Sequence, residues 1–330
     1  MSRKPPDLDK LATGIEAGER ASLARAITLA ESTRPDHRAA ANALLARLLP
    51  RTGSAIRVGI SGPPGAGKST MIEKLGVDLC AKGHRVAVLA IDPSSTVRGG
   101  SILGDKTRMG ELANHPDAFV RPTPSSGALG GVHDRTREAL LLCEAAGFDI
   151  VIVETVGVGQ SETAVSRLVD TLVVLLIAGA GDELQGIKKG VLEVADIVAI
   201  NKADGDNKMR ARRARKDFRA ALHLVRPRSQ HWSPPVLLAS AMESTGLDEL
   251  WAKVLEHRSL LQSIDVFDDK RESQRVDAMW HAVERGLMAR LRRDPDAQAV
   301  ARDVLDEVKS RNLTPGVAAQ RIMDAFAPDD

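Results

Sequence analysis

Residues 62–69 read Gly-Pro-Pro-Gly-Ala-Gly-Lys-Ser, which has the spacing of a phosphate-binding loop. The apolar run Ile56–Ile60 before it predicts a buried strand, and Thr70–Leu75 after it predicts the start of a helix. Glycines permit the positive φ angles with which backbone amides converge on phosphate oxygens at a helix N-terminus. We therefore expect Lys68 to reach the β- and γ-phosphates of a nucleotide and the Ser69 hydroxyl to ligate Mg²⁺.

Short apolar runs alternate with helical patterns on either side of this loop. The strand candidates are 56–60, 86–91, 118–121, 149–154, 171–178, 196–201 and 236–240. Their apolar runs are continuous rather than alternating, as in parallel strands that are buried on both faces. The sequence thus predicts an α/β fold with a doubly wound, mostly parallel sheet, in which ligands bind beyond the carboxyl ends of the strands.

Helical patterns flank this α/β region on both sides. We expect an N-terminal helical extension over residues 1–53, a P-loop domain over 54–262 and a C-terminal helical segment over 263–330. The C-terminal segment carries an apolar stripe: Val276, Met279, Trp280, Val283, Leu287, Met288 and Leu291. Such a stripe packs within the chain or against a second copy. Because the short segment offers little to cover it, we expect a homodimer.

Two acids follow predicted strands at the edge where the phosphates would bind. Asp92 ends the second strand, and we expect it to hold Mg²⁺ opposite Ser69, directly or through water. Glu154 ends the fourth strand at the Walker-B position, and Gly157 after it is placed to sense the γ-phosphate. Each acid alone is also compatible with a helix cap or a turn, but their joint placement favours a metal site.

Residues 201–204 read Asn-Lys-Ala-Asp and close the sixth predicted strand. The carboxylate of Asp204 can accept hydrogen bonds from the ring and exocyclic N–H groups of guanine, and adenine has no such pair. We expect Lys202 to lie along the base plane and Ser240-Ala241 to contact the guanine carbonyl through the backbone. The sequence therefore predicts a site for GTP and GDP.

Two glycine-containing loops carry further candidates for the phosphate end of the site. After the second strand, Asp105 is a candidate Mg²⁺ ligand, and Arg98 or Arg108 is a candidate arginine finger. After the fifth strand, Lys188 is a candidate second cation for the γ-phosphate. For both loops, an ordinary surface connector stays open as the alternative reading.

The sequence lacks one residue of the catalytic pattern of Ras-like GTPases. Ras-like enzymes place a water-orienting Gln directly after the switch glycine. Here Val158 follows Gly157, and Gln160 stands two residues further on. We therefore expect slow intrinsic GTP hydrolysis that a partner stimulates.

The candidate residues fall into three groups. The nucleotide-binding set is Gly62, Pro63, Pro64, Gly65, Ala66, Gly67, Lys68, Ser69, Thr70, Gly157, Asn201, Lys202, Asp204, Ser240 and Ala241. The catalytic set is Lys68, Glu154, Arg108 and Lys188, and the metal set is Ser69, Asp92, Asp105 and Glu154.

The composition of the chain limits the classes of partner and the cellular compartment that we expect. The net charge of +2 and the scarcity of aromatics, five Phe and three Trp without Tyr, argue against a nucleic-acid partner. The longest apolar run, Leu172–Ala180, is too short to span a bilayer. No targeting pattern stands out near the N-terminus, and the two cysteines fit a reduced compartment, so we expect a cytoplasmic protein. The basic segment 208–219 indicates a solvated helix face or a docking surface for an acidic protein.

Taken together, these motifs resemble the MeaB/ArgK branch of the SIMIBI class of P-loop GTPases, the methylmalonyl-CoA mutase-associated GTPases. The resemblance covers most of residues 20–265. It rests on Gly62–Ser69, Ile91–Ser95, Gly100–Met109, Arg121–Gly127, Glu154–Glu162, Asn201–Asp204 and the 179–190 loop.

This resemblance implies a GTP-hydrolysing chaperone of an adenosylcobalamin-dependent mutase, methylmalonyl-CoA mutase, which gates cofactor loading and protects the enzyme. It also implies a homodimer joined through the C-terminal helices. Three other readings stay open: a nickel-insertion GTPase of the same class, a P-loop small-molecule kinase, and a membrane-targeting GTPase of the signal-recognition type, which would want a methionine-rich domain that the unclustered Met residues do not indicate. The first usually displays Cys and His ligands that are missing here, and the second leaves Asn201–Asp204 without a purpose.

Overall fold

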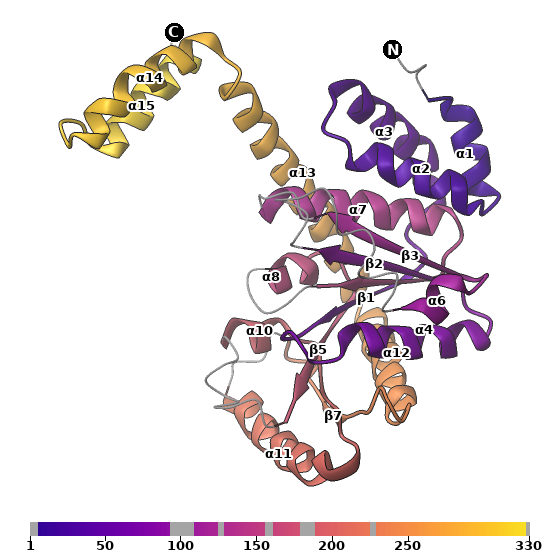
Figure 1. The fold of residues 1–330 in the computed structure, drawn as a ribbon. Coiled ribbons are helices and arrows are strands. Elements are labelled where there is room, and N and C mark those ends of the chain that lie inside the picture. Colours follow the sequence, from indigo (N-terminus) through magenta and orange to yellow (C-terminus); the bar gives the residue numbers. More distant parts are fainter. Residues whose placement is uncertain are drawn as a thin grey trace. The chain divides into compact units, whose positions relative to one another are not determined.

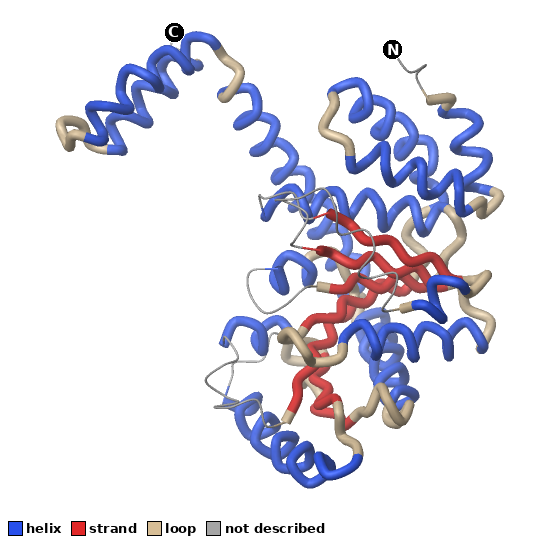
Figure 2. Tube along the Cα trace, viewed as in Figure 1, coloured by secondary structure: helices blue, strands red, loops and turns tan. Residues whose placement is uncertain are grey.

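The computed structural model describes residues 6–92, 109–124, 129–155, 161–178, 189–224 and 229–327 of the 330-residue chain. Its centre is a seven-stranded sheet in the order β3-β2-β4-β1-β5-β6-β7, and every neighbouring pair of strands is parallel. Helices flank the sheet (Figures 1 and 2). The predicted doubly wound α/β fold is confirmed.

All seven predicted strands are present, with boundaries within three residues of those expected. They are β1 Ile56–Ser61, β2 Val86–Asp92, β3 Ala118–Pro124, β4 Ile150–Glu154, β5 Thr171–Ile177, β6 Ile197–Asn201 and β7 Val236–Leu238. Because β1 lies in the middle of the sheet, with β4 on one side and β5 on the other, the loop after β1 leaves from the point where the strand order reverses.

The helices divide into an N-terminal group, a group that alternates with the strands, and a C-terminal group. The first comprises α1 Leu8–Glu16, α2 Arg20–Glu31 and α3 Pro35–Leu48. The second comprises α4 Lys68–Ala81, α6 Gly110–Asn114, α7 Leu129–Ala145, α8 Ser161–Ser166, α10 Lys189–Val194, α11 Lys208–Leu224 and α12 Leu247–Ser263. The last comprises α13 Val266–Leu291, α14 Pro295–Lys309 and α15 Pro315–Phe326.

Side chains of the central strands alternate between two apolar cores. In β4, Ile150 and Ile152 face the core built with α4 and α12. Val151 and Val153 face the other core, which α1, α2, α3 and α7 cover. Burial on both faces is the reason that the strand sequences read as continuous apolar runs.

Several helix starts follow from their capping residues. The Asp7 carboxylate accepts a hydrogen bond from the Lys10 amide at 3.1 Å and begins α1. The Thr314 hydroxyl accepts from the Val317 amide, and Pro315 occupies the first position of α15. These side chains satisfy amides that have no partner inside the helix.

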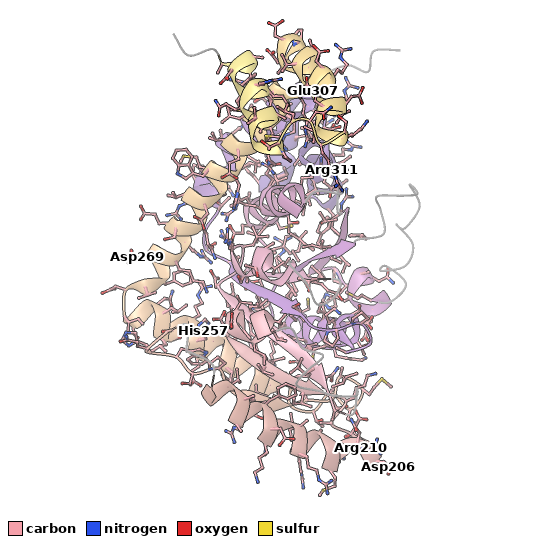
Figure 3. All side chains as sticks on the ribbon, turned by 90° about the vertical axis from the view of Figure 1, so that its left-hand side faces the viewer. Asp206, Arg210, His257, Asp269, Glu307 and Arg311 are labelled. Carbon is pink, nitrogen blue, oxygen red and sulfur yellow. The ribbon has the colours of Figure 1, made fainter. Side chains whose placement is uncertain are left out.

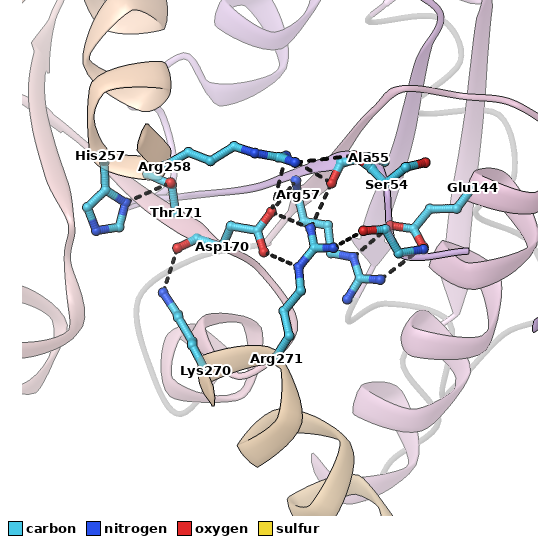
Figure 4. Close-up of polar contacts among 11 residues, drawn as sticks. Ser54, Ala55, Arg57, Glu144, Asp170, Thr171, His257, Arg258, Lys270 and Arg271 are labelled. Atoms are coloured by element: carbon cyan, nitrogen blue, oxygen red, sulfur yellow. Dashed lines mark hydrogen bonds and ion pairs between the residues drawn. The ribbon is translucent and has the colours of Figure 1, made fainter. Parts of the chain in front are cut away.

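A buried ion network lies at the amino ends of β1 and β5 (Figure 4). The guanidinium of Arg271 in α13 donates to both carboxylate oxygens of Asp170, at 2.9 and 2.8 Å. The guanidinium of Arg57 in β1 donates to both carboxylate oxygens of Glu144 in α7, at 2.7 and 2.9 Å. All four side chains are buried. Such pairs persist because each charge has a matched partner and additional hydrogen bonds.

The chain divides into two compact units, Met1–Glu272 and Ser273–Asp330. The second unit contains α14 and α15, which pack on one another, and carries exposed apolar side chains. Among the described residues, no helix combines the length and apolar character needed to cross a bilayer.

Candidate functional site

A cavity of about 780 Å³ lies at the carboxyl ends of the strands, where it is lined by residues at the ends of β2, β4 and β6 and in the segments after β1, β4, β6 and β7. Figure 1 places β1 and the start of α4 in the middle of the first unit. The lining residues are Pro64, Gly65, Gly67, Lys68, Ser69, Thr70, Ala90, Ile91, Glu154, Thr155, Asn201, Lys202, Asp204, Ala241 and Met242. The cavity therefore brings together two motifs that are more than 130 residues apart in the sequence, the glycine-rich loop and Asn201–Asp204.

The loop after β1 has a backbone that only glycine adopts easily at three positions. Gly62, Gly65 and Gly67 have φ angles of 148°, 80° and 83°. A Cβ on Gly62 would lie 2.2 Å from the Leu175 carbonyl oxygen, and a Cβ on Gly67 would lie 2.6 Å from Asn201 Nδ2. Close packing against β5 and Asn201 thus holds the loop in a compact turn at the start of α4.

Lys68 is the first residue of α4, and its ammonium group lies over the loop. Lys68 Nζ donates to the carbonyl oxygens of Gly62 at 2.9 Å and Pro63 at 3.2 Å. The residue is only 8% exposed, yet it lines the cavity. A cation at a helix N-terminus, whose amides are also partly positive, forms an anion site.

Oxygen donors for a hard cation lie next to Lys68. The Ser69 hydroxyl donates to Glu154 Oε1 at 2.9 Å, and both residues line the cavity. Behind them, the Thr155 hydroxyl donates to Ser61 Oγ at 2.7 Å. A hydroxyl and a carboxylate in contact beside an anion site are a donor set that suits Mg²⁺. In the part of the chain that the structure describes, no group of three or more His, Cys, Asp and Glu side chains could hold a metal by itself.

Asn201 connects the two halves of the cavity. Its side-chain Nδ2 donates to the Ala66 carbonyl at 2.7 Å, and its Oδ1 accepts from the Ala241 amide at 3.1 Å. Asn201 is 1% exposed, so these contacts are shielded from water. The amide side chain thereby fixes the spacing between the phosphate-binding loop and the loop after β7.

Asp204 is oriented by a hydrogen bond from the loop after β7. The Ser240 hydroxyl donates to Asp204 Oδ2, and the Glu243 amide donates to Ser240 Oγ at 3.0 Å. Lys202 adopts a left-handed backbone with φ of 58°, and its carbonyl accepts from Asn207 Nδ2 at 2.8 Å. A fixed carboxylate at the cavity wall can accept hydrogen bonds from N–H donors, which is what guanine recognition requires.

The structure places most of the predicted binding residues at the cavity. Of the described members of that set, Gly62, Pro63, Ala66 and Ser240 do not line it but hold Lys68, Asn201 and Asp204 through hydrogen bonds. The backbone of Asp92 ends β2, and its side chain lies outside the described part. Arg98, Asp105, Arg108, Gly157 and Lys188 also lie outside the described residues.

Four residues line the cavity that the motifs did not single out: Ala90, Ile91, Thr155 and Met242. Thr155 and Met242 directly follow the predicted residues Glu154 and Ala241, so their position next to these residues could have indicated that they line the site. Ala90 and Ile91 carry no such signal, because apolar residues at a strand end look like any other part of the core.

The chain matches the profile of a family described as methylmalonyl Co-A mutase-associated GTPase MeaB over residues 23–296. It is 56% identical over 317 residues to a "probable GTPase" of Mycobacterium tuberculosis, covering 96% of this chain and 94% of that protein. It is 47% identical over 310 residues to the GTPase ArgK of Escherichia coli, covering 94% of each chain.

Two further relatives extend the comparison to animals and to solved structures. The mitochondrial methylmalonic aciduria type A homolog of Mus musculus is 45% identical over 332 residues, with 97% of this chain and 79% of that protein covered. A crystal structure titled LAO/AO transport system kinase superposes with a TM-score of 0.78 at 39% identity, covering 98% of this chain and 99% of the other.

Proposed function

Since the chain belongs to the MeaB family of methylmalonyl-CoA mutase-associated GTPases, we propose that it binds GTP with Mg²⁺ and hydrolyses it to GDP and phosphate. The observation that carries this proposal is the single cavity of about 780 Å³ that Lys68 and Ser69 line together with Lys202 and Asp204. Its volume is in the range of small-molecule and cofactor pockets.

The β- and γ-phosphates, the guanine base and the Mg²⁺ ion each have a matching group in the described part of the chain. Lys68 and the amides at the start of α4 bind the β- and γ-phosphates. The Asp204 carboxylate accepts from the guanine N–H groups while Ser240 holds it in place. Ser69 and Glu154 hold Mg²⁺, with Asp92 and Asp105 as further ligands. When bound, Mg²⁺ neutralises phosphate charge.

We propose that hydrolysis is slow without a partner. The position after Gly157 carries Val158 instead of a water-orienting Gln. Arg108 and Lys188 are the proposed cations for charge that develops on the γ-phosphate. We expect a partner to raise the rate by bringing these cations to the γ-phosphate.

The proposed client is an adenosylcobalamin-dependent methylmalonyl-CoA mutase, whose cofactor loading the protein gates and whose activity it protects. The family description and the relatedness to a methylmalonic aciduria type A homolog support this client. We propose that the protein acts in the cytoplasm.

We also propose that the active form is a homodimer joined through its C-terminal unit. Within that unit, Met279, Trp280 and Leu287 are 51%, 57% and 50% exposed. Large exposed apolar side chains on a single helix mark an interaction surface. Trp280→Glu should shift the protein from dimer to monomer in light scattering coupled to gel filtration, and an unchanged mass would contradict this interface.

Single-turnover GTP hydrolysis with methylmalonyl-CoA mutase titrated in tests the function. We expect slow cleavage by the isolated protein and a rate that rises with mutase until it saturates. A lack of GTP binding would overturn the GTPase proposal. Normal GTP binding with no response to the mutase would overturn the client alone.

A further inference from the structure

Helix α11 carries a concentration of positive charge that the proposed nucleotide chemistry does not use. Its 17 residues include seven Lys and Arg against one Asp, a net charge of +6, whereas the whole chain has a net charge of +2. The helix rests on the core through Ala211, Ala214 and Phe218, which are 0%, 2% and 1% exposed. The remaining faces of the helix are cationic, and Figure 3 labels Arg210 in its first turn.

Five of these cations form a line along the helix. Lys208, Arg212, Arg215, Lys216 and Arg219 follow the spacing i, i+4, i+7, i+8 and i+11, which places them on one side, and we call them the basic stripe. Among the described residues, Lys208 is the one member of the stripe with an ion-pair partner, Glu243 at 3.5 Å. Like charges at this spacing destabilise a helix. An acidic partner would remove that penalty.

A chain of side-chain and backbone contacts connects Lys208, the first residue of the stripe, to the Asp204 carboxylate that is proposed to bind guanine. Lys208 Nζ pairs with the Glu243 carboxylate, and the Glu243 amide donates to Ser240 Oγ at 3.0 Å. The Ser240 hydroxyl in turn donates to Asp204 Oδ2. A change at Lys208 thus reaches Asp204 through two intervening residues.

We propose that the basic stripe docks an acidic segment of a partner protein, and that docking competes with Glu243 for Lys208 and lowers the affinity for guanine nucleotide. The inference rests on the proposed function, because it takes Asp204 as the guanine-binding carboxylate. The acidic segment and GDP then lower each other's affinity for the protein by the same factor.

Two features favour a protein over a nucleic acid as the partner. Phe218, the one Phe, Tyr or Trp residue of α11, is buried and offers no stacking surface for bases. Met209 follows Lys208 in the sequence and is 60% exposed, and Met242 directly precedes Glu243 and is 79% exposed. Methionine is enriched at protein interfaces, where it adapts to the partner's shape.

The test measures binding of a poly-L-glutamate peptide to the full-length protein and the release rate of fluorescent GDP. A peptide of about 12 residues is long enough to cover the roughly 17 Å that the stripe spans at 1.5 Å per residue. Arg212→Glu/Arg219→Glu should weaken peptide binding by about tenfold or more, since close charge pairs are reversed. The matched control, Arg210→Glu/Arg213→Glu, changes the same charge on another side of the same helix and should keep most of the binding.

A separate variant, Glu243→Gln, tests the coupling between peptide docking and nucleotide binding. In the wild type, saturating peptide should accelerate GDP release by about fivefold or more. Glu243→Gln should still bind the peptide, but its GDP release should already be faster and should not respond to the peptide. An equal loss of peptide binding in both double variants, or a charge-matched oligodeoxynucleotide that binds more tightly than the peptide, would overturn the docking proposal.

Unchanged GDP release on peptide binding would overturn the coupling to Asp204. Failure of the proposed function is a separate result, because fluorescent GDP would then not bind before any peptide is added. Thermal unfolding of all variants checks that the substitutions, which lie at exposed positions, leave the fold intact.

Discussion

The Asn201 side chain donates a hydrogen bond of 2.7 Å to the backbone carbonyl of Ala66, 135 residues earlier in the chain. The first residue of the Asn-Lys-Ala-Asp motif is therefore part of the support of the phosphate-binding loop. The same amide accepts from Ala241. Asn201 couples the parts of the cavity proposed to hold the phosphates and the base.

Asn201→Ala should destabilise the protein and weaken GTP binding together. The substitution leaves the buried Ala66 carbonyl and the buried Ala241 amide without partners, at about 1–3 kcal/mol for each. Urea unfolding and GTP titration calorimetry measure the two effects. Asn114→Ala, at an exposed position of α6, is the control and should change neither. Retention of full stability would show that Asn201 does not support the loop.

Gly67→Ala and Gly65→Ala form a matched pair in the phosphate-binding loop. Both residues have φ near +80°, so each substitution adds about 1 kcal/mol of backbone strain. Among the described residues, the new Cβ would meet another atom only at Gly67, Asn201 Nδ2 at 2.6 Å, while Gly65 has none within 4 Å. Thermal unfolding of the nucleotide-free protein should therefore show a larger loss for Gly67→Ala. Equal losses would contradict the packing against Asn201.

Asp204→Asn should remove the preference for guanine over adenine nucleotides. An amide presents one acceptor and one donor, whereas the two N–H groups of guanine need two acceptor oxygens. The lost selectivity should be on the order of 2–4 kcal/mol. Calorimetry with GTP and ATP measures it, with Asp206→Asn at an exposed position as the control. Unchanged selectivity in Asp204→Asn would refute the assignment of the guanine site.

Arg271→Met should destabilise the first unit strongly without touching the cavity. It leaves the Asp170 carboxylate buried beside a neutral side chain, and breaking a buried pair in this way costs about 3–5 kcal/mol. The Arg271 guanidinium also donates to the Ala55 carbonyl at 2.7 Å, so that acceptor loses a partner as well. Arg275→Met, exposed one turn further along α13, should have little effect in the same urea titration. A small loss for Arg271→Met would mean that the Arg258 guanidinium, 3.9 Å from Asp170, and the Arg57 amide compensate for the missing partner.

Glu31 should make stability fall as the pH rises above the ordinary range of a carboxyl group. Burial raises the pKa of Glu31 above its usual value, although the Arg121 guanidinium, 2.5 Å away, opposes the shift. The folded state then holds this proton more tightly than the unfolded chain, so stability present at low pH is lost as the pH rises through the folded pKa. The free energy of unfolding of Glu31→Gln, relative to wild type, should therefore improve from about pH 4 to about pH 7.

A relative stability of Glu31→Gln that declines over the same range would reverse the inferred sign. In that case the ion pair with Arg121, rather than burial, would dominate the titration of Glu31.

Local sequence patterns predicted the strands and the motifs at their ends because these depend on short-range chemistry. A continuous apolar run reports a strand buried on both faces, and a glycine at positions such as 62, 65 and 67 reports a backbone that other residues resist. The strands of this sheet could therefore be located to within a few residues. The identity of the cavity residues Lys68, Ser69 and Asp204 followed from the same motifs.

Contacts between distant segments were beyond such patterns, since they depend on the order in which the strands pair. The sequence contains no local mark that joins Arg57 to Glu144, 87 residues away, or Arg271 to Asp170, 101 residues away. Both contacts arise from the sheet order, which puts β4 and β5 on either side of β1. A charged residue in an apolar neighbourhood reads as solvent-exposed until its partner's position is known, and that position is a property of the assembled sheet.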